Sequence, residues 1–232
     1  MPISASIFVR CLALFVAVLG ASGCTYKPGY EDSPVARSFA WFSYLNADDI
    51  RSQCSGSGPD RYRIVYNGNT DEQVRTYDIT ADSGGGGDLK VQVTGVADWA
   101  AGVPIDDLLS PWRGRIERRQ LSADQLQAIR SALRASGYST PPPDGTILRS
   151  WSFYWLAAAC EGGQFTFNGW GYPSNRFARV TLAGPLMAVD PTGIAFNPPR
   201  DDTRPDQDDR RRQRYYQLVI TSEGIRDNFT PF

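Results

Sequence analysis

Three segments of the chain alternate polar and apolar residues with a period of two, and this alternation constrains the fold more than any other feature. The segments are Arg61–Tyr66, Gln73–Thr80 and Leu89–Thr94. Successive side chains of a strand point to opposite faces, so this period is typical of strands with one buried face. Asn67-Gly68-Asn69 separates the first two segments and is typical of a tight hairpin turn. The sequence therefore predicts antiparallel strands that pair in chain order.

A fourth segment has the period of a helix. Ser122 and Gln125 match the Ser-x-x-Gln pattern of a capping box, in which each side chain bonds the backbone N–H of the other residue. Gly137 follows the periodic stretch, where helices commonly end. The sequence therefore predicts one main amphipathic helix over about 122–136. Its apolar stripe is formed by Leu126, Ile129 and Leu133.

The second half of the chain adds further strand-like segments. Trp151–Cys160 and Gln164–Asn168 flank the turn Glu161–Gly163 and predict a second hairpin. Phe177–Ala183 predicts a weaker strand, and Tyr215–Thr221 predicts a strong one. Together these elements predict an α+β fold, in which the one main amphipathic helix packs on a face of an antiparallel sheet.

The composition excludes several kinds of chemistry. The chain has no His, so it contains no Ser-His-Asp triad, no Cys-His pair and no His-ligated metal. Its only Lys residues are Lys27 and Lys90, which leaves few positions for an amine nucleophile. With 24 Lys and Arg against 25 Asp and Glu, the net charge of −1 argues against broad nucleic-acid binding. We therefore expect no catalytic residue, no cofactor, no metal and no nucleic-acid partner.

One stretch, Pro198–Arg214, consists almost wholly of charged and polar residues. Its aspartates lack the Asp-x-Asp-x-Asp-Gly spacing of a calcium loop, and arginines lie between them. A solvated, mobile loop over 198–214 is therefore the better interpretation than a calcium site.

The N-terminus is typical of an export signal. Cys11–Leu19 is an apolar run that follows Arg10, and it is too short to cross a bilayer, which takes about 20 residues. Small residues then lead to Cys24 in the sequence Ala21-Ser22-Gly23-Cys24. The same small residues also suit an ordinary signal peptidase, and both interpretations start the mature chain at Cys24.

The sequence Ala21-Ser22-Gly23-Cys24 resembles the bacterial lipobox, the motif in which a Cys receives a diacylglyceryl group. The resemblance implies that the protein is a lipoprotein whose partner is a membrane, reached through a lipid anchor at Cys24. Thr25 follows this Cys, and by analogy with enterobacterial sorting a residue other than Asp implies the outer membrane. The predicted organisation is a signal peptide over 1–23, a tether over 24–38 and a single domain over 39–232.

Two cysteines remain, because Cys11 lies in the removed segment and Cys24 takes the lipid. Cys54 and Cys160 form an even pair in an oxidising compartment, which favours a disulfide. The alternative is two unrelated buried thiols. A bridge would close a loop of about 100 residues, and in the chain-entropy model long loops gain most from a cross-link.

Aromatic residues gather around the segment Asn168–Pro173, in which glycines flank Trp170. A glycine-rich loop gives little support for burying a ring, so Trp170 and Tyr172 are the candidate ligand-binding residues. The residue before a proline favours an extended backbone, which helps to present Tyr172. The competing interpretation is that these rings are packed in the core.

These observations favour a cell-envelope lipoprotein that is not an enzyme and that binds a protein or glycan partner. The alternative is a periplasmic glycan hydrolase with two carboxylates held about 5–10 Å apart. Nothing in the sequence brings a pair together among the available carboxylates, which are those of Asp106, Asp107, Glu117 and Glu161. A third interpretation is an inhibitor or chaperone-like module with an open sheet edge.

Overall fold

The computed structural model describes residues 34–95, 114–201 and 215–229. Several predictions fall outside these ranges, namely the signal peptide 1–23, the lipid site Cys24, the tether residues 24–33 and residues 202–214 of the charged loop. The chain divides into two compact units, Met1–Tyr44 and Leu45–Phe232.

The described part of the first unit is helical. Helix α2 (Pro34–Leu45) begins within the last residues of the predicted tether, 24–38, and reaches the boundary between the units. The rings of Trp41 and Tyr44 stack along this helix, with their centroids 5.7 Å apart and their planes inclined by 14°. Among the helices in the described ranges, none is long and apolar enough to cross a membrane.

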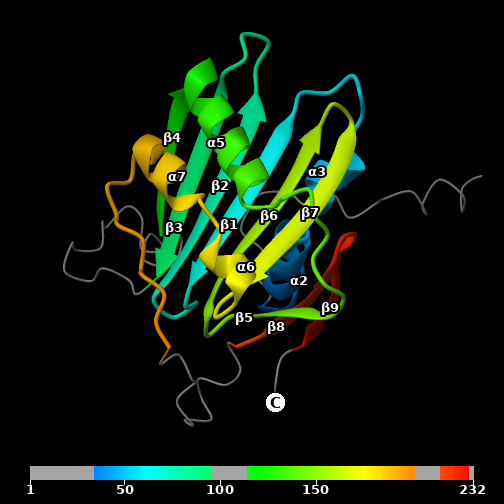
Figure 1. Cartoon of the computed structure of the whole chain (residues 1–232), viewed down its shortest axis with the longest axis vertical. Coiled ribbons are helices and arrows are strands. Elements are labelled where there is room, and N and C mark those ends of the chain that lie inside the picture. The colour runs from blue at the N-terminus through cyan, green and yellow to red at the C-terminus, as the bar shows by residue number, and fades with distance from the viewer. Residues whose placement is uncertain (1–33, 96–113, 202–214, 230–232) are drawn as a thin grey trace, which may run out of the picture. The chain divides into compact units, whose positions relative to one another are not determined.

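The second unit is built on a six-stranded antiparallel sheet with the strand order β4-β3-β2-β1-β6-β7 (Figure 1). Its strands are β1 (Arg61–Gly68), β2 (Gln73–Ala81), β3 (Gly87–Gly95), β4 (Arg115–Leu121), β6 (Phe153–Glu161) and β7 (Gln164–Gly171). A three-stranded antiparallel sheet has the order β5-β8-β9, with β5 (Thr146–Arg149), β8 (Gln217–Thr221) and β9 (Gly224–Phe229). The broad prediction of an antiparallel α+β protein, rich in strands, is confirmed.

The period of two decides which residues of the large sheet are buried together. Tyr62, Ile64 and Tyr66 of β1 lie on one face, and Ile64 is paired with Tyr77 of β2 and with Ala157 of β6. These five residues are at most 2% exposed and belong to one hydrophobic core. The alternation in the sequence therefore identifies the face that joins this core, but β1 is not half-buried as predicted, because Arg63, Val65 and Asn67 on its other face are buried as well.

Helices α5 (Ala123–Ala135) and α7 (Ala183–Val189) cover this face of the sheet (Figure 1). α5 begins with the predicted capping box: the Ser122 hydroxyl accepts a hydrogen bond from the Gln125 N–H at 3.3 Å, and the Gln125 side chain accepts one from the Ser122 N–H at 3.0 Å. The buried stripe of α5 joins the sheet core and consists of Leu126, Ile129, Ala132 and Leu133.

The prediction of one main helix is not what the structure displays. α2 has 12 residues and α5 has 13, so the two are nearly equal in length. Shorter helices are α3 (Asp48–Ser52), α6 (Asn175–Ala178) and α7. The coarser statement, that helices accompany a predominantly antiparallel structure, is the one that holds.

The prediction of a weaker strand over Phe177–Ala183 is wrong. The first residues of this segment lie in α6, because the hydroxyl of Ser174 accepts a hydrogen bond from the Phe177 N–H at 3.1 Å and caps that helix. Leu182, which is fully buried, then leads directly into α7. The cap of α6 and the buried Leu182 at the start of α7 therefore account for the helical turns found where the alternation predicted a strand.

The predicted disulfide between Cys54 and Cys160 is confirmed, with Cα atoms 5.5 Å apart across a sequence separation of 106. It joins the segment after α3 to the end of β6. Ion pairs hold the same region, since Arg63 bonds Asp49 of α3 at 2.7 Å. Burial alone would raise the pKa of Asp49, but Arg63 and then Arg61 outweigh burial and hold that pKa below its ordinary value.

Candidate functional site

Trp170 is a core residue and is not available to a ligand. It lies in β7 opposite Trp155, is 1% exposed, and its indole N–H donates to the Ser136 carbonyl at 3.0 Å. The glycine before it reflects packing against the small sheet: a Cβ at Gly169 would lie 2.6 Å from Cδ1 of Ile220. The expectation of an outward-facing Trp170 in a loop is therefore wrong, because this segment is a strand covered on both faces.

Replacement of Trp170 by Phe is expected to lower the free energy of unfolding by about 2 kcal/mol, since the smaller ring leaves a void and the Ser136 carbonyl loses its donor. Tyr172→Phe removes one hydroxyl at the surface and is expected to change stability by less than about 0.5 kcal/mol. Urea unfolding of the two variants measures the contrast. Equal losses in both would contradict this assignment of core and surface.

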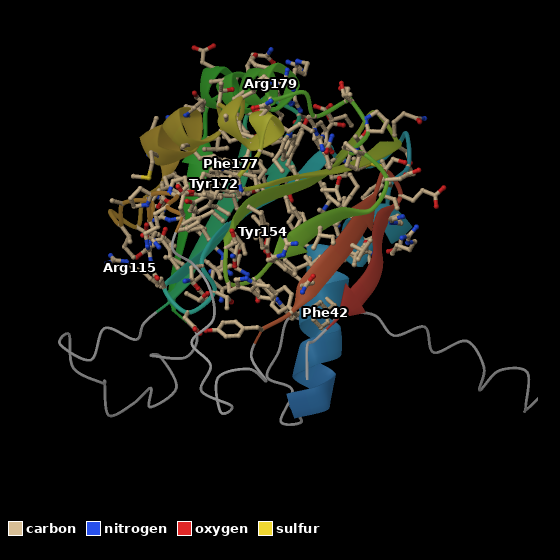
Figure 2. The ribbon with its side chains drawn as sticks, turned by 60° about the horizontal axis from the view of Figure 1, so that its bottom comes forward. Phe42, Arg115, Tyr154, Tyr172, Phe177 and Arg179 are labelled. Carbon is tan, nitrogen blue, oxygen red and sulfur yellow. A yellow bond between two sulfur atoms is a disulfide. The ribbon has the colours of Figure 1, made fainter. Side chains whose placement is uncertain are left out.

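Tyr172 is partly exposed and is held in a defined position. Its hydroxyl donates to Oδ1 of Asp201 at 2.7 Å. Its ring packs edge-on against two others, with centroid distances of 6.0 Å to Phe153 and 5.3 Å to Phe177. Figure 2 shows Tyr172 and Phe177 as neighbours. Tyr172 is therefore the one of the two candidate ligand-binding residues that a partner can reach.

A hollow of about 540 Å³ opens beside Tyr172. It is lined by Tyr172, Pro173, Ser174, Asn175, Phe177 and Ala178. Within the lining segment, the guanidinium of Arg176 donates to the Asn168 side chain at 2.8 Å and to the Gly169 carbonyl at 3.3 Å. The hydroxyl of Ser174 donates to the Gly171 carbonyl at 2.7 Å. These bonds fix the lining segment to the end of β7.

Arginines lie in and around the segment that lines the hollow. Burial lowers the pKa of Arg176 below its ordinary value, and the neighbouring charge of Arg179 adds to the effect. Arg200 pairs with Glu72 and lies over the Phe153 ring, with its guanidinium carbon 5.5 Å from the ring centroid. The hydrogen bond to the Asp201 carboxylate, followed by burial, raises the pKa of the Tyr172 hydroxyl. The hollow thus has aromatic rings in its lining, and one of them, Tyr172, is bonded to the Asp201 carboxylate.

Asp201 belongs to a segment that sequence analysis did not recognise as functional. We call residues 190–201 the strap. It starts at Asp190, whose carboxylate bonds Arg75 of β2 at 2.5 Å, and both side chains are 0% exposed. Gln73 and Arg75 also donate to the Ala195 carbonyl, at 2.9 and 3.2 Å. The one signal in the sequence is the alternation in β2, which places a charged Arg75 among buried residues.

The carboxylates considered for a hydrolase are held in ion pairs or lie outside the described ranges. Glu161 accepts a hydrogen bond from the Tyr62 hydroxyl at 2.6 Å. Arg130 lies 3.9 Å from Glu161 and 2.9 Å from Asp60. Glu117 pairs with Arg115 of the edge strand β4 at 3.1 Å, and residues 106 and 107 are not described. Asp60 and Glu161 thus form a structural ion-pair cluster with Arg130, in which two carboxylates offset the charge of one arginine.

The part of the chain that the structure describes contains no group of three or more Cys, Asp and Glu side chains able to hold a metal ion. The lining of the hollow presents the rings of Tyr172 and Phe177 together with short polar side chains. Comparison of the chain with protein-family models, with curated proteins and with solved structures found no match.

Proposed function

We propose that the protein is a non-catalytic lipoprotein of the bacterial cell envelope. In this proposal a lipid on Cys24 anchors it to the outer membrane, and the folded part binds a protein or glycan partner from the periplasmic face. The observation that carries the binding proposal is Tyr172, a partly exposed ring fixed by Asp201, Phe153 and Phe177 beside a hollow. Within the fold, we propose that α5 is the main amphipathic helix.

Two features support export. The disulfide between Cys54 and Cys160 is of a kind that persists in oxidising compartments and is rare in reducing ones. The sequence up to Cys24 resembles a signal peptide with a lipobox. Both features favour an oxidising compartment outside the cytoplasm.

Two features favour binding over catalysis. The chain has no His, so proton transfer near neutral pH would need a strongly perturbed carboxylate or Lys. The carboxylates of Asp60 and Glu161 both lie within ion-pair distance of Arg130. The alternative of a glycan hydrolase needs two carboxyl groups that face a sugar across a cleft, so the engagement of these two by one arginine favours binding over that alternative.

The anchor predicts a specific mature N-terminus. Mass spectrometry of the membrane fraction is expected to find Cys24 as the first residue, carrying a diacylglyceryl group. Cys24→Ala is expected to move the protein out of that fraction, and Cys11→Ala serves as the matched control that leaves it there. A mature chain that begins at an unmodified Cys24 would refute the lipoprotein proposal and leave a secreted protein.

The binding site is tested by crosslinking in intact cells. A photoreactive benzoylphenylalanine in place of Tyr172 is expected to capture a discrete partner, and the same probe at Ser222, in the β8–β9 turn, is expected not to. Ser222 is exposed and lies outside the hollow lining, which makes it the matched control. The site proposal fails if the two positions give the same products.

A further inference from the structure

The hydroxyl of Tyr172 already binds a carboxylate, that of Asp201 at 2.7 Å. Asp201 is exposed, and Tyr172 is only partly buried. A hydrogen bond between groups that water can reach contributes little net free energy, because water replaces either partner when the bond breaks. A second carboxylate can therefore take the place of Asp201 at small cost.

The rest of the strap does not depend on this contact. Its buried anchor is the Arg75–Asp190 pair, whose side chains are both fully buried. Asn197 adds a second attachment, since its side chain donates to the Gly68 carbonyl at 2.7 Å and to Glu72 at 2.6 Å. Release of Asp201 from Tyr172 thus leaves the strap held to β1 and β2 and requires no unfolding.

The surroundings of Tyr172 place apolar groups beside its hydroxyl donor. Arg176 lies within the lining segment but its guanidinium is bonded to Asn168 and to the Gly169 carbonyl, and Arg200, which directly precedes Asp201, pairs with Glu72. Tyr172 and Phe177 meet at 74°, so their rings form a corner with two apolar walls. Such a corner suits the side chain of a peptide better than the flat face of a sugar, which stacks on a single open ring.

We propose that Asp201 stands in for a ligand carboxylate, and that the hollow binds peptides in which a carboxylate adjoins an aromatic or apolar side chain. This inference rests on the proposed function and specifies its partner class. The ligand carboxylate accepts the hydrogen bond of the Tyr172 hydroxyl, its side chain enters the corner with Phe177, and Asp201 is displaced.

Two pairs of probes test the proposal on the mature protein in detergent micelles, with the backbone amide chemical shifts of Gly171, Tyr172 and Ser174–Ala178 as the readout. N-acetylphenylalanine and its amide differ only in the carboxylate, and N-acetylmuramic acid differs from N-acetylglucosamine by a lactyl ether that carries a carboxylate. The wild type is expected to bind N-acetylphenylalanine about threefold more tightly than the amide, the modest preference that a hydrogen bond within reach of water supplies. It is expected to bind both sugars more weakly than N-acetylphenylalanine.

Two variants identify the groups involved, with Ser222→Ala as the control. Tyr172→Phe is expected to abolish the preference for acid over amide, because it keeps the ring and removes the donor. Asp201→Ala is expected to strengthen binding of the acid about threefold or more, because the internal competitor is gone. Both changes affect exposed or partly exposed groups, so the fold is retained.

Equal affinity for acid and amide, no binding of either, or no gain from Asp201→Ala would each overturn the proposal. Tighter binding of N-acetylmuramic acid than of N-acetylphenylalanine would assign the carboxylate to a glycan and overturn the peptide assignment. These failures differ from failure of the proposed function, because crosslinking at Tyr172 would still capture a partner if the hollow binds something without a carboxylate.

Discussion

Replacement of both Cys54 and Cys160 by Ser is expected to lower the free energy of unfolding by about 5 kcal/mol. The disulfide spans 106 residues, and in the chain-entropy model a loop of this length removes much of the freedom of the unfolded chain. Denaturant unfolding under oxidising conditions measures the loss. For a domain of this size it is a large share of the total stability, which is typically about 5–15 kcal/mol.

The same experiment separates the covalent bond from the packing of the two sulfurs. Wild-type protein in a thiol reductant is expected to fall close to the stability of the double variant, whereas the reductant leaves the variant itself unchanged. A loss below about 2 kcal/mol would show that the unfolded chain was already constrained in other ways. The fold would then depend mainly on the sheet and on the ion pairs between α3 and β1.

Much of the sheet was predictable because local pattern and tertiary environment agree there. Tyr62, Ile64 and Tyr66 of β1 recur with a period of two, and their face is the one that α5 and α7 cover. The capping box of α5 is a purely local device, so four residues suffice to locate its start. The pairing of Cys54 with Cys160 followed from counting cysteines rather than from any structural pattern.

The missed elements are those whose stability comes from neighbours. β4 reads RIERRQL and shows no alternation, because it is an edge strand whose side chains are mostly exposed. α7 reads AGPLMAV, and its glycine and proline resemble helix breakers. Pro185 lies in the first turn of α7, where a missing N–H does no harm, and Leu186 and Val189 are buried in the core.

The candidate site shows the same division. Trp170 and Tyr172 are two residues apart, so in a strand they would lie on the same face. The sequence does not indicate which of them is still covered by neighbouring elements. The Trp170 indole donates a hydrogen bond to the Ser136 carbonyl. Tyr172 lies beyond the end of β7, and its hydroxyl donates to Asp201, 29 residues later in the chain. A contact of that separation depends on the strap, and no local pattern predicts where the strap lies.

Asp190→Ala is expected to lower the free energy of unfolding by about 3–5 kcal/mol, because it leaves the charge of Arg75 buried without a carboxylate. Both side chains are 0% exposed, and the Tyr77 hydroxyl also donates to the Asp190 carboxylate at 2.8 Å. Urea unfolding measures the loss. Glu117→Ala is the matched control: it breaks the exposed pair with Arg115 and is expected to cost less than about 1 kcal/mol.

A double variant distinguishes a buried charge from lost packing. Arg75→Met combined with Asp190→Leu removes both charges and keeps apolar bulk, so it is expected to recover most of the loss caused by Asp190→Ala. If the double variant is as unstable as the single one, the hydrogen bonds from Arg75 to the strap matter more than the charge pair. Since the strap carries Asp201 to Tyr172, Asp190→Ala is also expected to loosen that contact, whereas Glu117→Ala leaves it intact.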